Sequence, residues 1–198
     1  MYKKLLRLTL SLMFLWTALP VVSQNIKTVD FAMNEVSRAD ILGLGDVQIN
    51  AENARYYQFD IDALKSQMAG VMYREDPGVG FLAQLKLPHP NGIVYNYQAK
   101  GNRTMHSDLG ALFPEITSYE AAGLDNVAKV KWDITPAGFH AMIMLLDEST
   151  IFIDPVINGN SEYYIVYHRN DFSTDKTMNC DVTNNDLTSK TLPAGGVE

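Results

Sequence analysis

Apolar and polar residues alternate along much of the chain between residues 79 and 168, as in strands that bury one face. In the run AKVKWDIT the alternation buries Val130, Trp132 and Ile134 and exposes the residues between them. The run GFHAMIMLL is more continuously apolar and predicts a central strand. The other predicted strands are VGFLAQLKLP, IVYNYQAK, EITSYEA, IFIDP and EYYIVYHR, and the turn HPNG joins the first two into a hairpin.

Two stretches carry the period of a helix. In DIDALKSQMAGVM four apolar residues fall on one face, namely Ile61, Leu64, Met68 and Val71. The main helix is predicted over Asp62–Met72, with Asp60 as its N-cap rather than as a catalytic partner of Asp62. A short second helix is predicted to be capped by Ser107. Its apolar face holds Leu109, Leu112 and Phe113.

These elements predict an α+β fold, in which an antiparallel sheet of about six strands packs against one main helix and one short helix. The folded domain is expected over residues 56–172. Residues 24–55 show only weak periodicity and are expected to form a mostly irregular N-terminal arm. Residues 173–198 are expected to form a polar tail, and TLPAGGVE at its end has the composition of a linker.

Residues 1–23 have the order of a cleaved secretory signal peptide: basic residues, then an apolar run, then small residues before a cleavage site. The apolar run is short for a membrane span, which needs about 20 residues. No later segment is long and apolar enough to span a membrane. The mature protein is therefore expected to be secreted, to begin at Gln24 or Asn25, and to have no membrane segment.

The charge of the mature chain limits the classes of partner that it is expected to bind. Without the signal peptide it holds 13 basic and 23 acidic residues, a net charge of −10 with His neutral. A nucleic-acid partner is not expected, because phosphate binding needs clustered Lys and Arg. The single cysteine excludes an internal disulfide, so packing alone must hold the exported fold together.

Catalytic motifs are missing from the sequence. It holds no HExxH, no GxSxG, no phosphate-binding glycine loop and no dinucleotide fingerprint. Four histidines are spread along the chain, at positions 89, 106, 140 and 168, and the last two lie on predicted strands. Asn102-Arg103-Thr104 fits a glycosylation sequon. The chain itself is expected to be no enzyme, with no catalytic or cofactor-binding residue.

Several stretches resemble one family in their order and spacing. They are FDIDALKSQM, LKLPHPNG, LFPEITSYEAAGLD, ITPAGFHAMIM, TIFIDP, YYIVYHRNDF and NCDV. From Tyr56 to Val182 the chain is similar to the N-terminal propeptide region of secreted bacterial zinc metallopeptidases of the reprolysin-like (metzincin) type. The sequence departs from that family by stopping at Glu198, before any catalytic domain with HExxHxxGxxH.

The resemblance implies a prodomain that aids folding of a zinc metalloprotease and keeps the zymogen latent. The implied partner is the cognate protease domain, in cis or in trans, and the implied zinc belongs to that domain rather than to this chain. The alternative is a free-standing exported protein that binds or inhibits a protease in trans.

Cys180, the only cysteine, lies in TMNCDVTNND, after the last apolar run and before the linker-like end. The resemblance implies that its thiolate is a switch ligand, which occupies the open position of the protease's zinc and displaces the catalytic water. MNCDVT is also similar to the MCGVT switch stretch of animal reprolysins, although it lacks the glycine. The alternative is a thiol without a role at zinc.

Overall fold

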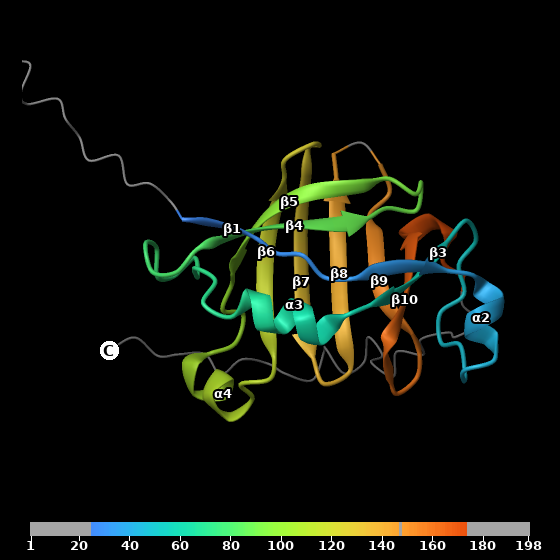
Figure 1. The fold of residues 1–198 in the computed structure, drawn as a ribbon, viewed down its shortest axis with the longest axis horizontal. Coiled ribbons are helices and arrows are strands. Elements are labelled where there is room, and N and C mark those ends of the chain that lie inside the picture. The colour runs from blue at the N-terminus through green and yellow to red at the C-terminus, as the bar shows by residue number, and fades with distance from the viewer. Residues whose placement is uncertain (1–24, 147, 174–198) are drawn as a thin grey trace, which may run out of the picture.

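The computed structural model describes residues 25–146 and 148–173 (Figure 1). Within these residues it contains ten strands: β1 (Ile26–Thr28), β2 (Met33–Val36), β3 (Arg55–Phe59), β4 (Leu82–Pro88), β5 (Val94–Gly101), β6 (Thr117–Gly123), β7 (Ala128–Thr135), β8 (Gly138–Leu145), β9 (Ile151–Ile157) and β10 (Asn160–His168). The helices are α2 (Arg38–Leu42), α3 (Ile61–Met68), α4 (Ser107–Leu112) and the 3-10 turn η1 (Arg169–Asp171).

All ten strands form one sheet, in the order β1-β4-β5-β6-β7-β8-β9-β10-β3-β2. The pair β1–β4 is parallel, and the other pairs are antiparallel. The expected α+β fold is therefore wrong: the described chain is mostly β, with a mixed sheet of ten strands and three α-helices. The strands that the prediction missed, β1, β2 and β3, are only three to five residues long. In β1 and β2 every side chain is exposed or half-buried, so neither shows the alternation from which strands are predicted.

One extended segment forms both ends of the sheet. Residues 26–36, here called the closing segment, contain β1 and β2. Ile26–Thr28 pair with Leu82–Gln84 of β4, and Met33–Val36 pair with Tyr56–Phe59 of β3. Because the two edges of the sheet meet the same segment, the sheet curls round and closes on itself.

Helix α3 holds the closing segment between its two pairings. The amide side chain of Gln67 accepts a hydrogen bond from the Asp30 amide at 3.1 Å and donates one to the Asp30 carbonyl. The Lys27 ammonium group donates to the Gln67 carbonyl at 3.0 Å. The Gln67 side chain thus takes the place of a neighbouring strand where the ladder is interrupted.

The core lies between two layers of this curled sheet. Figure 1 shows β4, β5, the closing segment and α3 on the near side, crossing in front of β6–β9. Four aromatic rings meet inside: Phe59 lies 4.7 Å from Tyr164, 5.7 Å from Phe31 and 6.1 Å from Phe139 between ring centroids. The buried Tyr164 hydroxyl donates to the Ser161 carbonyl at 2.7 Å and accepts from the Phe139 amide at 3.1 Å. Its polar tip is therefore satisfied inside the core.

A second, smaller core covers part of the outer side of the sheet. Residues 38–54, including α2, lie over β3, β9 and β10, and the cluster is formed by Ile41, Ala51, Tyr56, Val156, Ile157, Ile165 and Tyr167. Helix α2 begins with a capping box, in which Ser37 and Asp40 each accept from the other's backbone amide. Residues 24–55, expected to form a mostly irregular arm, contain the short elements β1, β2 and α2 with irregular residues between them, and part of this stretch covers the second core.

Local signals were predicted well. The Asp60 carboxylate caps α3 and accepts from the Ala63 amide at 2.9 Å, as expected. The helix ends at Met68 rather than Met72, because the backbone leaves the helical region at Ala69, whose ψ is 123°, and Gly70 follows with a φ of 83°. The hairpin of β4 and β5 is present, with Gly92 at a φ of 83° in its turn.

The short second helix is also present, but Leu109, Leu112 and Phe113 all stay exposed. His106 rather than Ser107 is its N-cap, since His106 Nδ1 accepts from the Asp108 amide at 3.4 Å. None of the helices in the described ranges has the length and apolar content needed to cross a membrane.

The closing segment yields a first prediction. Phe31→Ala removes a buried ring from the contact with Phe59 and should lower the free energy of unfolding by about 3 kcal/mol, measured by urea denaturation. Asn34→Ala, an exposed change on the same segment, should cost less than about 0.5 kcal/mol. A loss for Phe31→Ala as small as that for Asn34→Ala would show that the segment is not needed to close the sheet.

Candidate functional site

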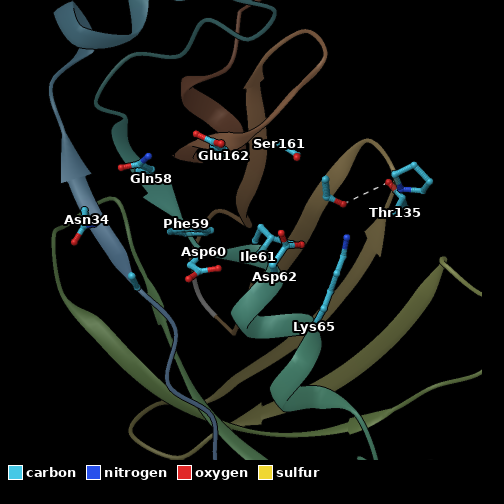
Figure 2. A pocket seen from close by; sticks show the side chains of 13 residues that line it. Asn34, Gln58, Phe59, Asp60, Ile61, Asp62, Lys65, Thr135, Ser161 and Glu162 are labelled. Carbon is cyan, nitrogen blue, oxygen red and sulfur yellow. Dashed lines mark hydrogen bonds between the residues drawn. The ribbon is translucent and has the colours of Figure 1, made fainter.

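Two sides of the molecule carry hollows of opposite charge. The first, here called the acidic pocket, has a volume of about 420 Å³ and lies at the start of α3 (Figure 2). Three carboxylates line it, from Asp60, Asp62 and Glu162, against the single ammonium group of Lys65. Figure 2 shows Lys65 rising beside Asp62 from the helix, with Glu162 on the far side of the pocket. The pocket therefore favours a cationic or strongly hydrogen-bonding group.

The acidic pocket gives little support to acid–base catalysis by Asp60 and Asp62. Asp60 is engaged as the cap of α3, and both side chains are exposed to solvent. The sequence expectation that Asp60 serves as a cap agrees with this geometry.

The second side is the outer face, formed by the outward side chains of β5–β9. Because strand registers place cross-strand partners side by side, these residues form three rows. The first row is Gln98, Ala122, Lys129 and Met144; the second is Lys100, Glu120, Lys131, Met142 and Phe152, continued by Tyr167 of β10; the third is Ser118, Asp133, His140 and Asp154. Along β6, β7 and β8 these side chains are exposed or half-buried.

A hollow of about 570 Å³, here called the basic hollow, opens over the first two rows. Ala122 forms part of its floor, since a methyl group leaves space between longer neighbours. Three lysines line it against one glutamate, in the set Lys100, Lys129, Lys131 and Glu120. Glu120 is occupied by Lys100 at 3.3 Å and Arg74 at 3.4 Å. Lys129 and Lys131 form no ion pair with a carboxylate of the described residues.

The third row contains His140, a half-buried histidine whose pKa is raised. His140 Nδ1 lies 3.0 Å from Asp154 Oδ1, and the Tyr167 hydroxyl donates to Asp154 Oδ2 at 2.9 Å. The hydrogen bond that the His140 ring donates to the Asp154 carboxylate raises the pKa of His140, and the partial burial of the ring opposes this rise. Burial also raises the pKa of the neighbouring Asp133. These groups adjoin the basic hollow through Lys131, which lines both it and a hollow of about 330 Å³ over the third row.

The other histidines do not join His140. His89 is buried, with Nε2 2.5 Å from the Tyr97 hydroxyl, and burial lowers its pKa to about 4. His106 caps α4, and His168 Nδ1 contacts the Ser149 carbonyl at 3.2 Å. Within residues 25–146 and 148–173 no cluster of three or more His, Cys, Asp or Glu side chains is suited to a metal ion.

Asn102 of the glycosylation sequon is only 7% exposed, so the folded domain hinders attachment of a glycan there. Cys180, the proposed switch ligand, and the expected signal peptide at residues 1–23 lie outside the described residues. The last described residues, Phe172 and Ser173, lie next to the outer face. The Phe172 ring is 6.1 Å from that of Tyr167, which ends the second row.

The chain matches no protein-family model, no curated protein and no solved structure.

Sequence reasoning missed the outer face. Each row combines residues from four or more strands, so the rows exist only once the register between strands is known. The available signal was the alternation itself, which marked Lys129, Lys131 and Asp133 as the exposed residues of one strand.

A second prediction concerns His140. Its pKa should lie above 6.5 in the folded protein, and Asp154→Asn should lower it, because the hydrogen bond to the carboxylate is the largest cause of the rise. A folded-state pKa above the unfolded value stabilises the fold fully below about pH 6.5, and this stabilisation is lost as the pH rises through the folded-state pKa. NMR titration of the histidine ring signals measures the shift. An unchanged His140 pKa in Asp154→Asn would contradict the assignment, while His89, which lies elsewhere, provides the internal control.

Proposed function

We propose that this chain is the prodomain of a secreted, reprolysin-like zinc metalloprotease, and that it aids folding of the protease and keeps it latent. The resemblance of residues 56–182 to such propeptides supports the family. The observation that supports the mechanism is that Phe172 and Ser173, which precede Cys180 in the sequence, are held against the folded domain.

The anchor consists of three contacts. Phe172 packs on Tyr167 and forms a bridge with Ala51, and the Ser173 amide donates to the Asn50 carbonyl at 3.4 Å. Cys180 follows Ser173 by seven residues. Seven residues span at most about 25 Å, so the thiol can act only on a partner that sits against this side of the domain.

A thiolate suits the proposed role. Zinc in a catalytic site has three protein ligands and an open fourth position, at which it activates water. A cysteine thiolate binds zinc at about 2.3 Å and would fill that position. The water is then excluded, and the protease has no nucleophile for peptide hydrolysis.

The third prediction tests this role. In the precursor, or in a mixture of the chain with its cognate protease domain, Cys180→Ser should weaken inhibition roughly a hundredfold, because a neutral hydroxyl is a far poorer zinc ligand than a thiolate. The inhibition constant against a fluorogenic peptide measures the effect. Ser189→Ala, a change in the same stretch that leaves the thiol intact, is the matched control.

Two results would contradict the proposal, the first its prodomain role and the second its zinc switch. One is a reading frame that neither continues into HExxHxxGxxH nor has a neighbouring gene for such a protease that the chain inhibits. The other is full inhibition by Cys180→Ser, which would leave steric cover of the cleft as the cause of latency and remove Cys180 from the mechanism.

A further inference from the structure

The outer face over β6–β8 is not covered by another segment of the described chain, and the charge of its basic hollow is opposite to that of the whole chain. Residues 38–54 cover the outer side of β3, β9 and β10, whereas β6, β7 and β8 keep their outward side chains exposed or half-buried. The whole chain has a net charge of −7, yet the basic hollow has three lysines and one glutamate. A locally positive area on an acidic protein favours a partner that presents negative charge there.

The lysines of the hollow alternate with methionines. Lys129 lies opposite Met144, and Lys131 lies opposite Met142, in neighbouring positions of β7 and β8. Methionine side chains are unbranched and polarisable, so they adapt to partners of varied shape. Lysine supplies a point charge on an adjustable stem, which suits carboxylates without fixing their geometry. The combination fits an acidic polypeptide that carries apolar side chains among its carboxylates.

We propose that the outer face over β5–β8 is a docking surface for an acidic polypeptide segment of the partner, whose carboxylates pair with Lys129 and Lys131 and whose apolar side chains pack on Met142 and Met144. This inference deepens the proposed function, on which it rests for the identity of the partner: the segment belongs to the protease domain.

The position of the chain's exit supports this occupant. The second row runs from Lys100 through Lys131 and Phe152 to Tyr167, and Tyr167 packs on Phe172. A partner engaged by Cys180 therefore lies beside the end of this row, within the reach of seven residues. Tyr167 is buried in the second core, so the exposed part of the row ends at Met142 and Phe152, and a partner there lies next to the covered end of the row on which Phe172 packs.

Nucleic acid and anionic lipid are poorer occupants of the same lysines. Binding of either draws its strength from many phosphate contacts, and the hollow offers three lysines on a chain with a net charge of −7. The repulsion of the remaining acidic surface opposes an extended polyanion more than it opposes a short peptide.

The test uses the mature chain, residues 24–198, and three blocked nine-residue peptides as probes. They repeat Glu-Glu-Phe, Glu-Glu-Ser or Lys-Lys-Phe. The first should bind most tightly and the second more weakly for lack of apolar contacts, whereas the third should not bind at the basic hollow, so that Lys129→Glu with Lys131→Glu does not weaken its binding. Binding of the first should weaken as salt rises, since the Debye length falls from about 10 Å at 0.1 M to about 3 Å at 1 M. Fluorescence anisotropy of labelled peptides measures the affinities.

Charge-reversal variants locate the site. Lys129→Glu with Lys131→Glu should weaken binding of the Glu-Glu-Phe peptide at least tenfold at low salt. The matched control is Arg38→Glu with Lys86→Glu, which changes the net charge equally at exposed basic residues outside both the basic hollow and the acidic pocket and should bind as the parent does. Both variants are checked for an unchanged unfolding midpoint, and Lys129→Gln replaces the reversal if the double variant does not fold.

Three outcomes overturn the docking surface: no binding of the Glu-Glu-Phe peptide by the parent chain, an equal loss in the control variant, or tighter binding of single-stranded DNA or phosphatidylglycerol vesicles than of the peptide. Failure here is distinct from failure of the proposed function. If Lys129→Glu with Lys131→Glu leaves latency intact while Cys180→Ser abolishes it, the docking surface is wrong and the prodomain role stands. If the peptide binds as expected and Cys180→Ser changes nothing, the surface stands and the zinc switch falls.

Discussion

The pairing of one segment with both edges of the sheet is the constraint on which the rest of the structure depends. An open sheet leaves two rows of unpaired amide and carbonyl groups, which invite pairing with other chains. Here β4 and β3 both meet residues 26–36, so each edge is used within the same chain. The price is an interrupted ladder at Asp30, and the Gln67 side chain compensates for it from α3. The helix that fills the open side of the sheet is thus tied to the segment that closes it.

Closure of the sheet also gives the two faces of each strand different surroundings. The inner face, with Trp132, Phe139 and Tyr164, is sealed in the main core. The outer face is divided, because residues 38–54 cover only β3, β9 and β10. Beyond that cover, the polar positions of β6–β8 are left for solvent or for a partner. The alternating pattern of these strands is that of an ordinary half-buried sheet. The basic hollow stays open because the covering segment, residues 38–54, does not reach β5–β8.

The elements that could be predicted are those whose information is local. Asp60 predicts the helix cap that it forms, and Pro90-Asn91-Gly92 predicts the turn in which it lies. The alternation around Trp132 predicts the strand β7. The closing segment could not be predicted in this way. Its strand partners lie 20 or more residues away in sequence, and Ile26–Thr28 is exposed throughout. The rows of the outer face could not be predicted for a related reason, since only the register between β7 and β8 brings Lys131 and Met142 together. Cys180 was found by its position along the chain, and the described residues do not include it.

The length of β10 separates the acidic pocket from the last described residues of the chain. Glu162 of the acidic pocket and Tyr167 beside the chain's exit lie on the same strand, five residues apart. At about 3.3 Å per residue they are separated by roughly 16 Å along the strand, and their side chains point to different surroundings. A partner held at the acidic pocket would lie on the α3 side of the sheet, and a seven-residue connection from Ser173 would have to pass round the sheet to reach it. A partner on the outer face would lie on the side of the sheet where Phe172 packs on Tyr167. Seven residues span up to about 25 Å, which exceeds this separation, so the outer face is favoured by lying on the same side of the sheet as Phe172 and not by its distance.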